Sequence, residues 1–165
     1  MPFLSFAKIQ KDGFENVVSV DPKDPNNAFV KEVRLFQQDR AKYPLPRFML
    51  YSPNKDDDGH DPTLFPKKGL AKSSNWLKHF LAEWFPLDES TKGTLVVITF
   101  DESEGQEETN RIYTVFLGDM IKPGEVTATY THYNLLRTIE DNFGLGTLNT
   151  GDKAVENDPI TGIWK

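Results

Sequence analysis

The residues best suited to chemistry stand where an apolar stretch ends in two carboxylates. Residues 94–100 read TLVVITF and run directly into Asp101 and Glu102. Carboxylate oxygens are the ligands that hard divalent cations prefer, and in an irregular turn two neighbouring side chains can converge on one ion. The pattern predicts a metal site at Asp101 and Glu102. The alternative is a solvated acidic loop, since three further glutamates follow within residues 103–108.

A second polar constellation, DDDGHD, occupies residues 56–61. His60 beside acidic neighbours can serve as a general acid or as a metal ligand, or it can hold the turn by hydrogen bonds. Residues 54–59 also match the first half of a helix-loop-helix calcium site. The twelfth position of that site requires a bidentate glutamate, and Phe65 stands there instead. We therefore exclude a calcium loop and retain His60 as a candidate.

The remaining histidines and serines offer weaker signals. A protonated His132 would be disfavoured in the first turn of a helix, and His79 adjoins an aromatic stripe, so both are predicted to be structural. A hydrolase elbow needs a G-x-S-x-G setting, and no serine of the chain has one. The serines considered were Ser52, Ser73, Ser74 and Ser103. No nucleophile is identified by these patterns.

The elements that must position these residues alternate between strand and helix patterns. Periodicity predicts helices over residues 28–40, from residue 73 or 74 to 85, and from 132 to 143 with Gly144 after the last turn; apolar runs predict strands over residues 47–52, 94–100 and 112–117. A long polar loop is expected over residues 53–72 and an irregular tail over 146–165. This alternation favours a three-layer α/β fold with a mostly parallel sheet, in which ligands gather at the carboxyl ends of strands.

Composition sets further limits. The chain has 165 residues, 38% of them hydrophobic, which suits a single domain over residues 1–165. The net charge of −6, without a cluster of basic residues, argues against nucleic acid as a partner. No apolar window is long enough for a membrane span, so a soluble protein is expected. The absence of cysteine excludes disulfides and thiol nucleophiles but leaves the compartment open.

Four stretches taken in order resemble the phosphoesterase family of non-hemolytic phospholipases C and acid phosphatases. They are LPRFMLYSPNKDDDGHDP, LVVITFDESEG, YTVFLGDMIKPG and THYNLLRTIEDNFGL. The resemblance extends over most of the chain, and its specific motifs are the Asp-Glu after a strand and the helix that Asp141 closes. It implies part of an alkaline-phosphatase-like α/β core that hydrolyses phosphate esters, in a family whose members are often secreted.

The resemblance also assigns roles. It implies that Asp101 and Glu102 bind a divalent metal ion of unknown identity, and that His60 lines the phosphate site with support from Asp61. Family members carry a Glu-Asn metal pair and a hydroxyl nucleophile in an amino-terminal half, and Glu15-Asn16 does not match the context of that pair. We expect a weak hydrolase completed by a homodimer or by a complementing amino-terminal half. The alternative is a non-catalytic interaction or effector-like protein on half of the fold.

Overall fold

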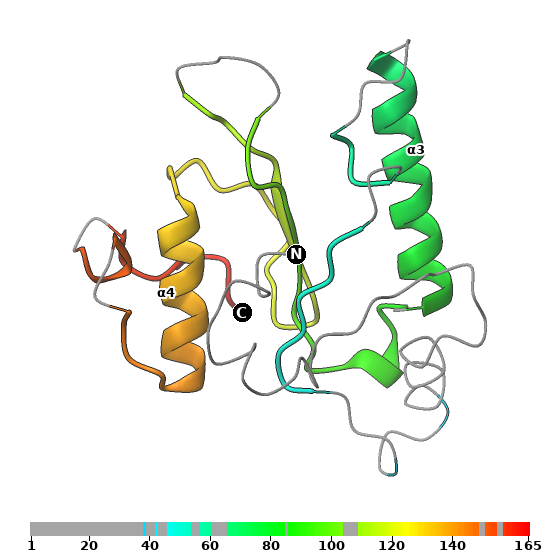
Figure 1. Ribbon diagram of the computed structural model, residues 1–165. Coiled ribbons are helices and arrows are strands. Elements are labelled where there is room, and N and C mark those ends of the chain that lie inside the picture. Colours follow the sequence, from blue (N-terminus) through cyan, green and yellow to red (C-terminus); the bar gives the residue numbers. More distant parts are fainter. Residues whose placement is uncertain are drawn as a thin grey trace, which may run out of the picture. The chain divides into compact units, whose positions relative to one another are not determined.

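In a computed structural model of the chain, the structure describes residues 38, 42, 46–53, 57–60, 66–84, 86–103, 109–148, 151–154 and 157–165. Figure 1 traces the chain, with the helices α3, Pro66–His79, and α4, His132–Phe143, labelled. The chain divides into two compact units. Unit 1 comprises Met1–Lys92 and Phe100–Ile112, and unit 2 comprises Gly93–Thr99 and Tyr113–Lys165. The chain therefore passes between the units at residues 92–93, 99–100 and 112–113, and each unit is described by itself below.

The main described element of unit 1 is the helix α3, Pro66–His79, which continues as a π-helical turn, Phe80–Trp84. The helix begins well before residue 73, so the predicted loop over residues 53–72 is too long. A proline is compatible with the first helical turn, where its missing N–H is not needed. Trp76 of α3 and Phe80 of the π-helical turn stack on each other with ring centroids 5.1 Å apart. Tyr51 packs against both rings, at 5.6 and 5.2 Å.

The strand predicted over residues 47–52 is wrong. These residues are irregular, and two of their apolar side chains are half exposed, Phe48 at 50% and Leu50 at 58%. A strand needs a paired neighbour, and the strands of the described sheet, Val96–Thr99 and Thr114–Leu117, pair with each other. Of the helix predicted over residues 28–40, only Gln38 is described, and it is helical; the rest of that prediction lies outside the described residues.

Unit 2 contains a two-stranded antiparallel sheet. Strand β1, Val96–Thr99, pairs with β2, Thr114–Leu117, in a register that runs from Val96 opposite Leu117 to Thr99 opposite Thr114. The two threonine hydroxyls of the last pair are 2.8 Å apart. Both predicted strands are confirmed in shortened form, and so is the α/β class. The pairing is antiparallel, which a direct return connection allows, whereas a parallel pair requires a crossover.

The helix α4, His132–Phe143, confirms the last predicted helix and its end. Thr131 caps its amino terminus by accepting a hydrogen bond from the Tyr133 N–H, while the Asn134 side chain accepts from the Thr131 N–H at 2.7 Å. Gly144 ends the helix in the left-handed conformation, with φ 63°, as glycine does at low steric cost. Local sequence therefore fixes both ends of α4.

The carboxy-terminal segment is largely irregular, as predicted, yet it is packed. Ile160 and Ile163 are the buried apolar residues among those described, at 4% and 7% exposure. Trp164 forms an isolated antiparallel bridge with Ile121, and the Lys122 N–H donates to the Ile163 carbonyl at 2.8 Å. A 3-10 turn, Gly151–Lys153, precedes this segment. Irregular backbone thus provides much of the described core of unit 2.

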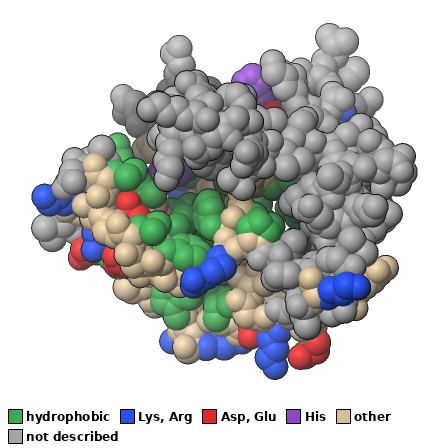
Figure 2. Space-filling model, turned by 60° about the horizontal axis from the view of Figure 1, so that its bottom comes forward, with side chains coloured by type: hydrophobic (Ala, Val, Ile, Leu, Met, Phe, Trp, Pro, Cys, Tyr) green, Lys and Arg blue, Asp and Glu red, His purple; other side chains and the backbone are tan. Residues whose placement is uncertain are grey.

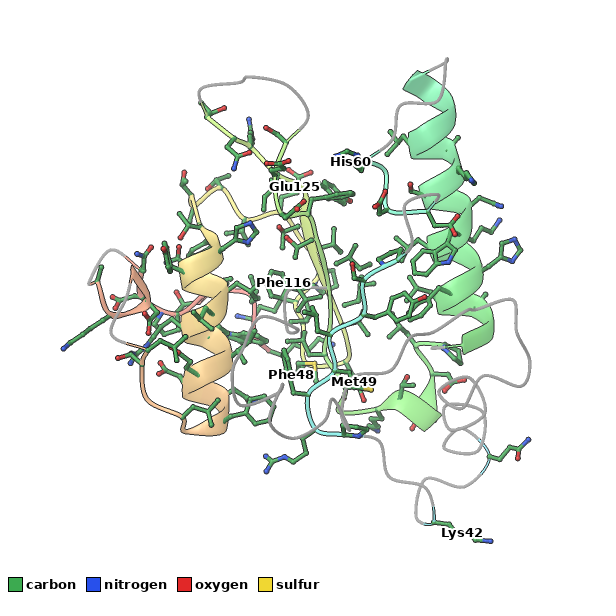
Figure 3. All side chains as sticks on the ribbon, viewed as in Figure 1. Lys42, Phe48, Met49, His60, Phe116 and Glu125 are labelled. Carbon is green, nitrogen blue, oxygen red and sulfur yellow. The ribbon has the colours of Figure 1, made fainter. Side chains whose placement is uncertain are left out.

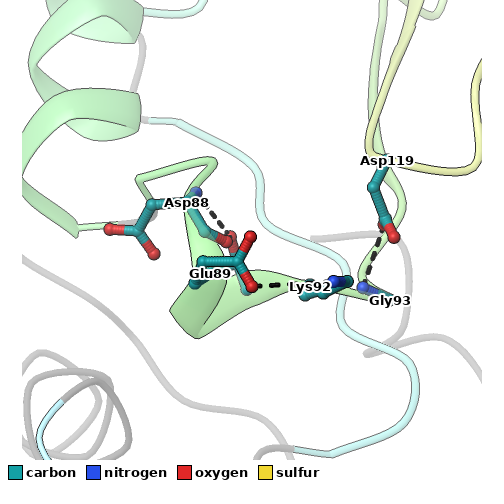
Figure 4. A network of polar contacts seen from close by, with 6 residues as sticks. Asp88, Glu89, Lys92, Gly93 and Asp119 are labelled. Atoms are coloured by element: carbon teal, nitrogen blue, oxygen red, sulfur yellow. Dashed lines mark hydrogen bonds and ion pairs between the residues drawn. The ribbon is translucent and has the colours of Figure 1, made fainter.

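Polar contacts also order the segment around residues 88–93 (Figure 4). In unit 1, the buried Thr91 hydroxyl accepts from the Asp88 N–H at 3.1 Å, and Lys92 lies 3.6 Å from Glu89. The second contact is exposed and contributes little to stability. In unit 2, the Gly93 N–H donates to the Asp119 carboxylate at 3.0 Å, which ties the start of the β1 segment to the residues after β2.

Apolar side chains remain on the surface of both units (Figure 2). Leu70 in unit 1 is 69% exposed, and Leu145 and Leu148 in unit 2 are 70% and 66% exposed. Within the described ranges, no helix combines the length and apolar character that a membrane crossing requires.

Candidate functional site

The turn that carries His60 is ordered by its own acidic residues. The Asp58 carboxylate accepts a hydrogen bond from the His60 N–H at 2.8 Å, and Asp57 is buried at 8% exposure. Gly59 has φ +90°, a conformation that a residue with a Cβ rarely adopts. The His60 side chain is exposed and lies beside α3 (Figure 3). The turn therefore presents an accessible imidazole on a backbone that glycine permits.

The acidic pair lies two residues beyond the end of β1. Asp101 and Glu102 are both exposed, and the Asp101 carboxylate accepts a hydrogen bond from the Glu102 N–H at 3.0 Å. Ser103 then donates from its N–H to the Asn110 side-chain oxygen at 2.8 Å. Asn110 has φ 40°, the left-handed region that asparagine tolerates better than most residues. The chain thus leaves the strand through polar residues whose side chains accept hydrogen bonds from nearby backbone N–H groups.

Gly59 links the two motifs within unit 1. A Cβ added to this glycine would lie 3.6 Å from the Phe100 ring and 3.4 Å from the Ser73 hydroxyl. Gly59 immediately precedes His60, and Phe100 immediately precedes Asp101. The residue before His60 therefore lies close to the residue before Asp101, although the two stretches are far apart in sequence.

Asp61, predicted to support His60, lies outside the described residues, as do the three glutamates of the acidic loop. Among the residues with described positions, no group of three or more histidine or acidic side chains is arranged to hold a metal ion. The chemistry of Asp101 and Glu102 fits a hard cation, but two carboxylates supply only part of the roughly six oxygens that such an ion takes.

The other histidines lie on helices. His79 is exposed in the last turn of α3, and His132 is exposed at the first position of α4.

The hydrogen-bonded turn is also consistent with the alternative structural role for His60. Most of the ligand positions of the rejected calcium loop, including Asn54 and Asp56, lie outside the described residues.

Sequence reasoning missed two residues of this region. The residue patterns give Ser73 no nucleophile setting and place Phe100 in an apolar strand, so neither is predicted to lie at the site. In the structure Ser73 is half buried, donates to the Gly69 carbonyl at 3.1 Å, and faces Gly59. The available signal was Gly59 itself, because a glycine between polar residues of a turn often marks a close approach of other groups.

Comparison with known proteins assigns the family. The model of the phosphoesterase family matches residues 12–146. The chain therefore belongs to the phosphoesterase family, which confirms the resemblance seen in its motifs. No solved structure matches the chain.

The curated relatives are phosphatases. The chain is 34% identical over 128 residues to an acid phosphatase of Aspergillus niger, covering 74% of this chain and 29% of that protein. It is 33% identical over 144 residues to a probable acid phosphatase of Kluyveromyces lactis, with 84% and 32% covered. It is 38% identical over 126 residues to a phosphatidylinositol-3-phosphatase of Mycobacterium tuberculosis, with 74% and 38% covered. The chain spans about a third of the length of these relatives.

Proposed function

We propose that this chain is the part of a phosphate ester hydrolase that carries the Asp-Glu metal pair and the phosphate-site histidine. The observation that carries the proposal is the Gly59 contact, which connects the turn of His60 to the residue before Asp101. Membership of the phosphoesterase family and the names of the relatives support the reaction class. Phosphate esters are accordingly the proposed substrates, in the manner of acid phosphatases or phospholipases C.

The proposed roles follow from the chemistry of each group. Asp101 and Glu102 hold a divalent cation, which when bound supplies positive charge for the equatorial oxygens of the phosphoryl group. His60 gives a proton to the alkoxide that leaves as the P–O bond breaks, and Asp61 orients the imidazole. The attacking hydroxyl comes from a serine or threonine of the region that longer family members carry ahead of this one.

The proposed architecture is the family core, a three-layer α/β domain with a mostly parallel sheet. The sheet of unit 2 would form part of that core. The repeated passage of the chain between the two units supports a single domain over residues 1–165. A complementing amino-terminal half would supply the nucleophile, and that half or a second copy of the chain would supply the remaining metal ligands.

The test is hydrolysis of p-nitrophenyl phosphate with Mg²⁺, Mn²⁺, Ca²⁺ or Zn²⁺ added singly. We expect slow, metal-dependent turnover that falls on the order of 100-fold in Asp101→Ala. Glu89→Ala is the matched control, because Glu89 is an exposed carboxylate in unit 1 whose side chain is 92% accessible. Equal rates in the wild type and Asp101→Ala would reject the site. Calorimetric titration of Asp101→Ala with the metal shows whether the variant has lost metal binding or only catalysis.

The second candidate is a non-catalytic interaction or effector-like protein that retains half of the fold. It is motivated by the serines of the chain, none of which has the G-x-S-x-G setting of a hydrolase nucleophile. Absence of turnover with every metal, together with a dimer in sedimentation, would support it. Turnover that depends on the acidic pair would exclude it.

A further inference from the structure

We infer that Ser73 is a positioning residue for His60, acting through its small size. The inference rests on the proposed function, because it assigns Ser73 a part in the same site. Ser73 lies on α3, and its hydroxyl is already used as a donor to the Gly69 carbonyl at 3.1 Å. Ser73 therefore affects the site because its small side chain leaves room for the turn at Gly59. It takes no part in the reaction itself.

The distances define that space. The Ser73 hydroxyl lies 3.4 Å from the position of a Cβ on Gly59, an ordinary contact distance with little room to spare. The distance from the same Cβ position to the Phe100 ring is 3.6 Å. Ser73 of α3 and Phe100, the residue before Asp101, therefore both pack against the turn at Gly59. Bulk added at position 73 must move the turn, the helix or both.

Movement of the turn reaches His60 directly. The Asp58 carboxylate binds the His60 N–H, so the turn moves as one hydrogen-bonded unit and carries the imidazole with it. A displacement of about 1 Å at a reacting group can reduce turnover by as much as 100-fold. Small residues at position 73 should therefore preserve the site, and large ones should displace the imidazole relative to the acidic pair.

The experiment compares Ser73→Leu with Ser73→Ala and with Ser74→Leu. Ser74 is the exposed neighbour on α3, so Ser74→Leu makes the same change of residue type on the same helix without the contact. The first measurement is the shift of the Gly59 and His60 amide resonances in the ¹H–¹⁵N spectrum. The second is kcat and KM for p-nitrophenyl phosphate with the preferred metal.

We expect Ser73→Leu to shift both amide resonances and to lower kcat at least about tenfold with little change in KM. Ser73→Ala and Ser74→Leu should resemble the wild type in both measurements. Unchanged Gly59 and His60 resonances in Ser73→Leu, or equal shifts in Ser74→Leu, would overturn the inference. If the wild type shows no turnover, the proposed function fails, and the resonances still decide whether position 73 controls the turn. Circular dichroism confirms that each variant is folded.

Discussion

Thr138 and Ile160 are joined by a hydrogen bond in which the Ile160 N–H donates to the threonine hydroxyl at 2.8 Å. The same hydroxyl donates to the Asn134 carbonyl one turn earlier in α4, at 2.7 Å. Asn134 in turn donates from its side chain to the Asp158 carbonyl at 2.9 Å. Two polar side chains of α4 thus fasten an irregular segment that contains the buried Ile160.

Replacing Thr138 by valine should destabilise the protein. The change keeps the shape of the side chain but leaves the Ile160 N–H without its acceptor, at a cost of about 1–3 kcal/mol in the free energy of unfolding. Urea denaturation followed by tryptophan fluorescence measures this loss. The exposed Thr127→Val is the control and should change stability by less than about 0.5 kcal/mol. Equal stability of the two variants would contradict the assigned hydrogen bond.

Glu140 should be a site where stability can be gained. Its side chain is 3% exposed, and its Oε2 atom is buried without a hydrogen-bond partner among the described residues. An unpaired buried carboxylate oxygen carries a desolvation cost, so Glu140→Leu is expected to raise the free energy of unfolding by about 1 kcal/mol or more. Glu125→Leu, at an exposed position, controls for the added apolar group. A marked loss of stability in Glu140→Leu would show that the Glu140 carboxylate stabilises the folded protein.

Two glycines of unit 2 allow steric crowding to be separated from backbone strain. Gly118 and Gly124 have nearly the same φ, 151° and 152°. A Cβ on Gly118 would lie 2.6 Å from the Met120 sulfur and 2.8 Å from the Thr94 carbonyl oxygen, whereas a Cβ on Gly124 meets nothing within 4 Å.

Gly118→Ala should therefore cost clearly more stability than Gly124→Ala. Strain at such a φ accounts for about 1–3 kcal/mol in both variants. The contact with a backbone carbonyl adds to the cost at position 118, because backbone atoms cannot move aside as the end of a flexible side chain can. Thermal unfolding by circular dichroism compares the two. Similar midpoints would argue against the close packing of the β1 and β2 segments.

Gly59→Ala should lower turnover more than it lowers stability. The added methyl group would make ordinary van der Waals contacts with Ser73 and Phe100, but a φ of +90° strains a residue with a Cβ, and relief of that strain would shift the turn together with His60. Gly162→Ala provides the comparison, since its φ is +79° and its surroundings are open. Backbone strain should cost both variants about 1 kcal/mol of stability. Only Gly59→Ala should reduce phosphatase activity. Equal activity of Gly59→Ala and Gly162→Ala would show that this turn is not part of the site.

Much of the fold could be predicted from local patterns. The strands around Val96 and Thr114 and the helix closed by Gly144 follow from apolar periodicity and from a glycine suited to a left-handed end. The early start of α3 at Pro66 was missed, because polar residues with a proline and a glycine also suit a loop. The strand over residues 47–52 was wrong because β-structure depends on a neighbouring strand, which a local pattern does not supply.

The sequence by itself determined the family, the acidic pair after an apolar strand and the glycine-containing turn of His60, since these depend on residue types and their order. Tertiary structure decided which of these motifs meet. The approach of Gly59 to Phe100 and Ser73 joins three distant stretches, and it depends on how a helix, a turn and a strand end pack in space. The same reason explains why the irregular tail became core, with Ile160 and Ile163 buried by contacts that no local pattern encodes.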